Sequence, residues 1–242
     1  MMRTKPEISI IIPAFNEEEN LPILLENLED HVRKFKLNVE YIIVDDSSRD
    51  GTLKVGKQLE RKIKNLRIIR NKFQRGMGNG IRFGIQNARG KMAVTVMADN
   101  VDDFSILPEM RRKIMKEGYK LAIGSRYLSP EYSNNIPLKY KICTKVFRAC
   151  SRIFLAIPIK DITNGYRAYD LEFARKLPLK RAGYEFSGEM TFKTWFNHGK
   201  ICEIGAKHGK RLKGFSKFSF KKIIPKFSGI FFEALLMRLS GR

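Results

Sequence analysis

The stretch Ile8–Glu17 (ISIIIPAFNE) consists of a short hydrophobic run that ends in polar and acidic residues. The pattern occurs twice more, where Tyr41–Val44 leads into Asp45-Asp46-Ser47-Ser48 and Met92–Met97 leads into Ala98-Asp99-Asn100-Val101-Asp102-Asp103. In an open parallel sheet the carboxyl ends of the strands line one crevice, and ligands bind there. We therefore expect three acidic strand ends to form one acidic crevice. Such a crevice in a basic protein is typical of a site for a metal cation and a phosphorylated ligand.

The first half of the chain alternates between strand-like and helical patterns, which predicts a mainly parallel sheet with helices on both faces. The expected strands are Ile8–Ile12, Tyr41–Val44, Leu66–Arg70, Met92–Met97 and Leu121–Gly124. The expected helices are Leu21–Phe35, Thr52–Ile63, Ile81–Ala88 and Ile106–Glu117. Beyond Tyr127 we expect a basic amphipathic helix over Leu138–Leu155, a turn into an extended segment over Thr163–Tyr169, and a short strand over Lys200–Ile204.

The charge of the chain points to an anionic partner. Its 242 residues include 47 Lys and Arg against 25 Asp and Glu, a net charge of +22. Nucleic acid, an anionic membrane surface or a phosphorylated substrate would suit this excess, and a heavily charged solvated surface would also produce it. Nucleic acid is disfavoured because the acidic strand ends would repel its phosphates, so we expect no nucleic-acid partner.

Cysteine usage and hydropathy indicate the compartment. The three cysteines form no CxxC pair, which favours a reducing environment. No uninterrupted apolar run approaches the roughly 20 residues that span a bilayer. The run Ile8–Ile12 is too short for a signal peptide and is followed by acidic residues. We expect a cytoplasmic protein that is soluble or peripheral at the cytoplasmic face of a membrane.

Four later segments extend the pattern. They are Gly124–Tyr127 (GSRY), Asp161–Tyr169 (DITNGYRAY), Gly183–Met190 (GYEFSGEM) and Arg211–Lys217 (RLKGFSK). Together with the three acidic strand ends, they resemble the family 2 glycosyltransferases, and within them the dolichyl-phosphate mannose synthase type without transmembrane helices. The resemblance implies an α/β GT-A fold over residues 1–220. It places nucleotide-sugar binding in residues 1–125 and acceptor binding in residues 126–220, with an amphipathic tail over residues 221–242.

The resemblance assigns a donor site. It implies that the nucleotide sugar contacts Pro13, Phe15, Glu17, Val44, Asp45, Asp46, Ala98 and Asp99. A Mg²⁺ or Mn²⁺ ion would neutralise the departing diphosphate, and hard cations prefer carboxylate oxygens. Asp99, Asp102 and Asp103 follow directly on a hydrophobic run and are the expected ligands, although acids there also cap helices. Met97 departs from the usual Asp-Ala-Asp motif, which raises the alternative of a non-catalytic relative.

The resemblance also assigns an acceptor site. Arg126, Lys141, Arg211 and Lys217 would hold the acceptor phosphate, and Arg126, Arg211 and Lys217 would share the catalytic role with Asp99. A phosphate acceptor is already anionic and needs no general base. Asp161 or Glu189 would serve as a base only if its carboxylate faces the site. We expect an inverting, in-line displacement at the sugar carbon.

The predicted reaction moves mannose or glucose from GDP-mannose or UDP-glucose to polyprenyl (dolichyl) phosphate. Residues 207–226 carry eight Lys and Arg and no acid, and with the apolar tail they suit an anionic membrane surface. The tail could instead pack on the core as an ordinary helix, or a small membrane protein could recruit the enzyme. The alternative reaction is transfer to a hydroxyl of a glycan or glycolipid.

Overall fold

The described part of the protein is built on a seven-stranded sheet. The computed structural model describes residues 5–211, 213 and 220–240, and the strands are ordered β3-β2-β1-β4-β6-β5-β7. Their bounds are β1 Ile8–Ala14, β2 Val39–Asp45, β3 Leu66–Arg70, β4 Met92–Thr95, β5 Leu121–Ser125, β6 Arg167–Asp170 and β7 Ile201–Gly205. β6 runs antiparallel to both β4 and β5, and the other pairings are parallel.

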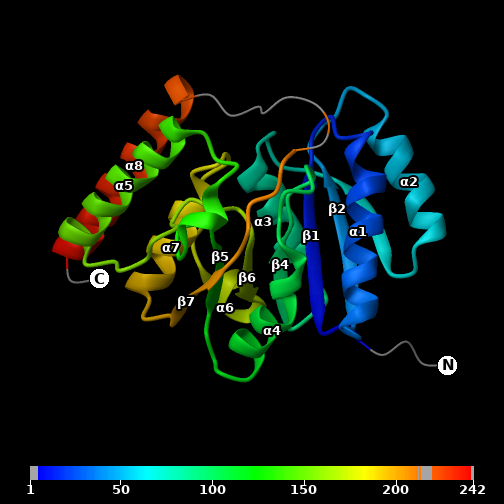
Figure 1. Ribbon diagram of the computed structural model, residues 1–242, viewed down its shortest axis with the longest axis horizontal. Coiled ribbons are helices and arrows are strands. Elements are labelled where there is room, and N and C mark those ends of the chain that lie inside the picture. The colour runs from blue at the N-terminus through cyan, green and yellow to red at the C-terminus, as the bar shows by residue number, and fades with distance from the viewer. Residues whose placement is uncertain (1–4, 212, 214–219, 241–242) are drawn as a thin grey trace.

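Helices cover both faces of this sheet (Figure 1). Their bounds are α1 Asn20–Lys34, α2 Thr52–Lys62, α3 Met77–Asn87, α4 Leu107–Met115, α5 Leu138–Leu155, α6 Leu171–Lys176, α7 Phe186–Phe196 and α8 Phe220–Leu239. Side chains of α1 and α4 share one buried cluster, and those of α3, α6 and α7 share the other. The predicted architecture, a mainly parallel sheet between two helical layers, is confirmed.

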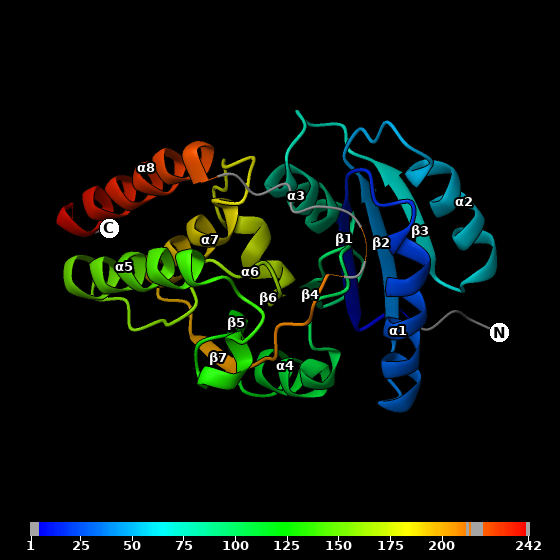
Figure 2. The same cartoon turned by 45° about the horizontal axis from the view of Figure 1, so that its top comes forward.

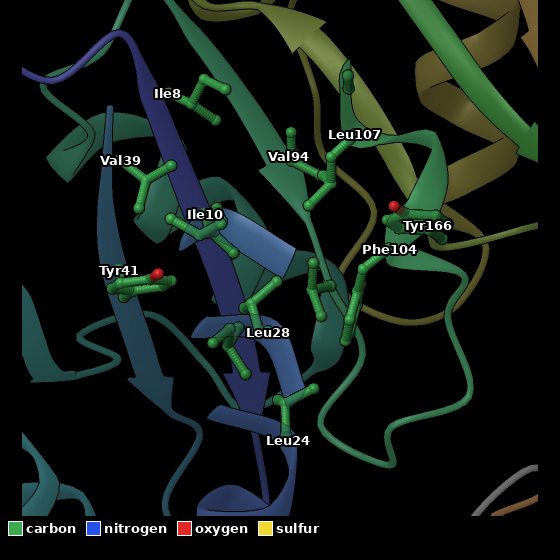
Figure 3. Close-up of a cluster of buried hydrophobic side chains, with 14 of the residues drawn as sticks. Ile8, Ile10, Leu24, Leu28, Val39, Tyr41, Val94, Phe104, Leu107 and Tyr166 are labelled. Carbon is green, nitrogen blue, oxygen red and sulfur yellow. The ribbon is translucent and has the colours of Figure 1, made fainter. Parts of the chain in front are cut away.

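The hydrophobic side chains of the central strand β1 explain why helices cover both faces of the sheet. Its seven residues are all buried, and alternate side chains point to opposite faces. Ile8 and Ile10 lie in one buried cluster with Leu24 and Leu28 of α1 (Figure 3), whereas Ile11 packs in the other. A strand that is hydrophobic at nearly every position is typical of a sheet buried on both sides.

Several element boundaries differ from the predicted ones, and two of these differences lie beside the strand ends and the loop before α7. β4 ends at Thr95 instead of Met97, because the chain turns there and the Met97 amide donates to Asp102 Oδ2 at 2.8 Å. Helix α3 begins at Met77, four residues before the predicted start. Its first turn packs closely on the loop before α7, since the Gly78 amide donates to the Ala182 carbonyl at 2.7 Å. A Cβ on Gly78 would lie 2.5 Å from the Arg181 carbonyl oxygen.

The helices α5 and α8 lie side by side at the end of the molecule opposite α2 (Figures 1 and 2). α8 buries Ile230 and Ala234 against the rest of the protein. Both helices also expose large apolar side chains, namely Leu138, Ile142, Val146, Ile153 and Phe154 of α5 and Ile224, Phe232, Leu236 and Leu239 of α8. Among the described residues, no helix is long and apolar enough to cross a bilayer.

Candidate active site

Three strand ends meet at one edge of the sheet, as the sequence predicts. β2, β1 and β4 are neighbours, and Ala14 at the end of β1 pairs with Asp45 at the end of β2. The chain leaves these strands through tight turns in which Asn16, Ser47 and Asn100 have positive φ angles of 54°, 63° and 57°. The residues that follow each turn therefore gather around one crevice, at the point where the strand order changes direction.

The crevice continues into a cavity of about 1050 Å³ that changes character along its length. At the strand ends its wall is charged and carries Glu17, Asp46, Arg75, Asp99, Asp102, Arg126 and Arg211. Towards α5 and α8 the wall becomes mainly apolar and carries Ile136, Pro137, Ile142, Val146, Phe147, Ile223, Ile224, Phe227, Phe231 and Phe232. A ligand that fills this cavity would need a polar and an apolar part.

Arg211 joins two of the acidic strand ends. Its guanidinium lies 3.1 Å from Glu17 Oε1 and 3.2 Å from Asp99 Oδ2. The other oxygen, Asp99 Oδ1, is buried and has no hydrogen-bond partner among the described residues. Burial raises the pKa of Asp99, and the charge of Arg211 opposes that shift. Asp99 thus offers one unused oxygen to a ligand of the cavity.

Asp102 and Asp103 are held differently. The Asp102 carboxylate is partly buried, accepts the Met97 amide, and has a pKa that desolvation raises to about 8. The Asp103 carboxylate caps the 3₁₀ turn Phe104–Ile106 through the Ser105 amide at 3.1 Å and accepts the Lys207 amide at 3.2 Å. It does not line the cavity. The capping that acids favour at a helix start is therefore the observed role of Asp103.

The site offers a carboxylate that would suit a divalent cation bound together with a phosphorylated ligand. The described residues contain no group of three His, Cys, Asp or Glu side chains arranged to hold a metal ion. Mg²⁺ is often bound by only one or two carboxylates together with substrate phosphates and water. The buried, unpartnered Asp99 Oδ1 suits that arrangement. The predicted roles of Asp102 and Asp103 as ligands stay predictions.

The predicted nucleoside residues divide into two groups. Pro13, Phe15, Glu17, Asp46, Ala98 and Asp99 line the cavity. Val44 and Asp45 are fully buried and do not line it. Asp46 accepts the Asn71 side-chain amide and the Gly76 backbone amide, both at 2.8 Å. Its pKa is raised by burial. These bonds fix the loop that carries Arg75.

Arg75 completes the wall around Phe15. Its guanidinium carbon lies 4.6 Å from the centre of the Phe15 ring, a cation–π distance. Arg75 is not among the site residues predicted from the sequence. The available signal was the glycine-rich run from Gln74 to Gly80, which brings a backbone close to a neighbouring segment. An aromatic ring and a planar guanidinium together suit a flat nucleobase that forms hydrogen bonds.

Arg126 lies at the middle of the cavity and is held by Asp161. Its Nε and Nη2 donate to the two Asp161 oxygens at 2.8 Å each, and Nη2 also reaches Thr163 Oγ1 at 3.3 Å. Burial acts to raise the pKa of Asp161, but the charge and hydrogen bonds of Arg126 outweigh it and lower that pKa. Nη1 has no hydrogen-bond partner among the described residues and can bind a ligand.

The other predicted acceptor residues fall in three places. Arg211 lines the cavity. Lys141 lies on α5 and does not line it. Lys217 lies outside the described residues. Neither candidate base faces the site, because Asp161 holds Arg126 and Glu189 is buried against Lys193 at 2.8 Å.

Fold and site together define a protein of the GT-A type. The model of the family described as glycosyl transferase family 2 matches residues 9–178. The chain therefore belongs to glycosyl transferase family 2.

Two curated relatives are similar over most of the chain. A dolichol-phosphate mannosyltransferase of Pyrococcus furiosus is 30% identical over 221 residues, which cover 90% of this chain and 60% of the relative. A polyprenol monophosphomannose synthase of Mycolicibacterium smegmatis is 29% identical over 221 residues, which cover 88% of this chain and 82% of that protein. The chain thus spans about three fifths of the archaeal relative's length.

Solved structures agree on the fold. Glucosyl-3-phosphoglycerate synthase of Mycobacterium tuberculosis, in complex with UDP, has a TM-score of 0.68 at 15% identity and covers 95% of this chain and 80% of that one. Mannosyl-3-phosphoglycerate synthase of Rubrobacter xylanophilus has a TM-score of 0.68 at 15% identity, with coverage of 97% and 74%. The predicted GT-A fold is confirmed.

Proposed function

We propose that the protein transfers a hexose from a nucleoside-diphosphate sugar to a polyprenyl phosphate, with inversion at the sugar carbon. The observation that carries the proposal is the single cavity that is charged at the strand ends and apolar between α5 and α8. A polyprenyl phosphate has a matching polar head and apolar tail. The two curated relatives, both named as enzymes of polyprenyl-phosphate mannosylation, support mannose as the sugar.

The donor would lie at the strand ends. Phe15 and Arg75 offer a stacking surface to the base, and Asp46 offers hydrogen-bond acceptors. The diphosphate would lie near Asp99 and Arg211. A divalent cation held there through Asp99 would act as a Lewis acid that stabilises charge on the departing diphosphate. Arg211 supplies a second positive charge to the same region.

The acceptor phosphate would lie against Arg126. Asp161 uses two donor groups of this guanidinium and thereby orients it, and Nη1 is left for a phosphate oxygen. A guanidinium is well suited to phosphate because it is planar and always charged. The ion pair also keeps the local net charge low, so the bound phosphate retains its nucleophilicity. Most of the rate acceleration would then come from positioning and charge neutralisation.

The carboxylates of the cavity favour a phosphate acceptor over a hydroxyl. A hydroxyl acceptor requires a general base near the sugar carbon. Of the four cavity carboxylates, Glu17 and Asp99 are paired with Arg211, Asp46 is bonded to Asn71, and Asp102 is bonded to a backbone amide. Each already has a structural partner, and the unused oxygen of Asp99 would bind the cation, whereas an anionic phosphate needs no base.

The exposed surface of α5 and α8 would dock on the membrane that holds the lipid. Basic residues accompany its apolar side chains, and Lys139, Lys145 and Arg152 of α5 and Lys226 and Arg238 of α8 are exposed. Apolar side chains with flanking Lys and Arg are typical of helices that lie in an anionic membrane interface. Side chains of both helices, among them the exposed Ile142 and Ile224, line the apolar part of the cavity, so a lipid tail could enter there directly from the bilayer.

Purified full-length protein should be incubated with polyprenyl phosphate in anionic vesicles, Mg²⁺ or Mn²⁺, and labelled GDP-mannose or UDP-glucose in parallel. We expect an acid-labile labelled lipid from one donor. Asp99→Asn should reduce its formation about a hundredfold or more, and Asp30→Asn, which alters an exposed carboxylate paired with Arg33, should not. Donor hydrolysis without lipid product would instead indicate a hydroxyl acceptor. The absence of both activities would favour a non-catalytic relative.

A further inference from the structure

His208 is a cavity residue to which the proposed reaction assigns no role. His208 follows β7 and lines the cavity close to Arg126 and Asp161, whose charges both act on its imidazole. Its backbone is fixed, since its amide donates to the Tyr132 carbonyl at 2.9 Å and its carbonyl accepts the Asn135 side chain at 2.7 Å. The ring is half-buried, and its nitrogens have no hydrogen-bond partner among the described residues.

Building on the proposed function, we propose that His208 binds the acceptor phosphate as a hydrogen-bond donor, on the same phosphate as Arg126. A fixed backbone and an unpartnered ring at the cavity wall are the features expected of a residue kept for a ligand. His208 lies between the strand ends and the apolar wall, where the phosphate head group of a lipid acceptor would bind.

The charge state of His208 suits this task. Burial and, to a smaller extent, the charge of Arg126 lower the pKa of its imidazole to about 4, and the charge of Asp161 opposes this shift. A neutral imidazole has one N–H donor. It can orient a phosphate oxygen without adding a positive charge, which would weaken that oxygen as a nucleophile. The same low pKa makes His208 a poor general base at neutral pH.

The experiment measures acceptor binding separately from transfer. Titration calorimetry with a short, water-soluble polyprenyl phosphate should be performed on the wild type, His208→Leu and His208→Gln, each as the full chain. We expect Leu to weaken binding by about tenfold or more, as for a lost hydrogen bond to a charged group. Gln keeps an N–H donor and should recover most of the affinity. His198→Leu, at an exposed histidine after α7, is the matched control and should bind normally.

Steady-state kinetics provide the second readout. In the transfer assay, His208→Leu should raise the KM for the acceptor and leave the KM for the donor within about twofold of the wild type. The inference is overturned if Leu binds the phosphate as tightly as the wild type, or if Gln is as defective as Leu. It is also overturned if both KM values rise together, because that result would indicate a structural role.

Failure of the proposed function has a different signature. If the wild type binds the short polyprenyl phosphate through His208 but transfers no sugar to it, this inference stands and the proposed reaction is wrong. If the wild type transfers sugar and the His208 variants match it in binding and kinetics, the proposed reaction stands and the role of His208 is wrong. If the wild type does neither, both are wrong.

Discussion

The ion pair between Arg126 and Asp161 gives the sharpest prediction about stability. Three hydrogen bonds join the two residues, and their side chains are 16% and 0% exposed. Asp161→Asn keeps the shape and removes the charge, which leaves a largely buried guanidinium unpaired. Removing one partner of a buried pair costs about 3–5 kcal/mol. The asparagine oxygen still accepts one hydrogen bond, so we expect a loss of about 3 kcal/mol in the free energy of unfolding.

Thermal and urea unfolding, followed by circular dichroism, would measure this loss. For a chain of this size, about 3 kcal/mol corresponds to a fall in Tm of roughly 6–12 °C. Glu172→Gln is the matched control, because Glu172 pairs with Lys176 on the surface with side chains 83% and 72% exposed. Exposed pairs contribute about 0–1 kcal/mol. The reasoning is refuted if Asp161→Asn unfolds within about 0.5 kcal/mol of this control.

The pH dependence of the free energy of unfolding tests independently whether the charge of Asp161 stabilises the fold. The pKa of Asp161 is lowered in the folded protein. Its contribution to the free energy of unfolding is therefore complete above the pKa of about 3.9 that Asp has in the unfolded chain. It is lost as the pH falls through the lower, folded value. The stability gap between wild type and Asp161→Asn should therefore be constant from about pH 5 to 8 and should narrow only below about pH 4.

Four further results are expected. Asp99→Asn should lower the transfer rate about a hundredfold or more with little change in Tm, measured with labelled donor. Phe15→Ala should raise the donor KM about tenfold through lost base stacking. Leu236→Glu should reduce sedimentation with anionic vesicles and leave transfer to a short soluble acceptor unchanged, whereas Gln58→Glu on α2 should alter neither. The ratio of acceptor affinities of the wild type and His208→Gln should stay constant between about pH 5.5 and 8, since the imidazole is already neutral there and the titration of the phosphate is common to both proteins.

The sheet was predictable because its strands carry their own signals. β1, β2 and β4 are hydrophobic runs that end in turn-forming and acidic residues, and their parallel pairing follows from the helices between them. The antiparallel strand β6 was seen only as an extended segment. Its position between β4 and β5 depends on pairings such as Thr95 with Arg167. Such pairings across long stretches of chain have no local sequence signature.

The site was predictable in its residue types and less so in their partners. Asp102 and Asp103 are equivalent in a sequence pattern, yet Asp102 accepts the Met97 amide and lines the cavity, whereas Asp103 caps the 3₁₀ turn Phe104–Ile106. Arg126 was predicted to bind phosphate, but its partner Asp161 lies 35 residues away and becomes visible only when the two segments meet. Side-chain direction at a turn is decided by tertiary packing. The sequence could therefore indicate an acidic crevice, but not which carboxylates face it.

The places where acidic and basic residues lie in the fold account for the large positive charge of the chain. The carboxylates gather at the ends of β1, β2 and β4, while many Lys and Arg accompany the apolar surface of α5 and α8. Negative charge thus lies where a cation and a diphosphate would meet, and positive charge lies where an anionic membrane would dock. The cavity connects these two regions, and the Arg126–Asp161 pair stands between them. In the proposed reaction a donor dissolved in water and an acceptor held in lipid would therefore reach the same point from opposite ends.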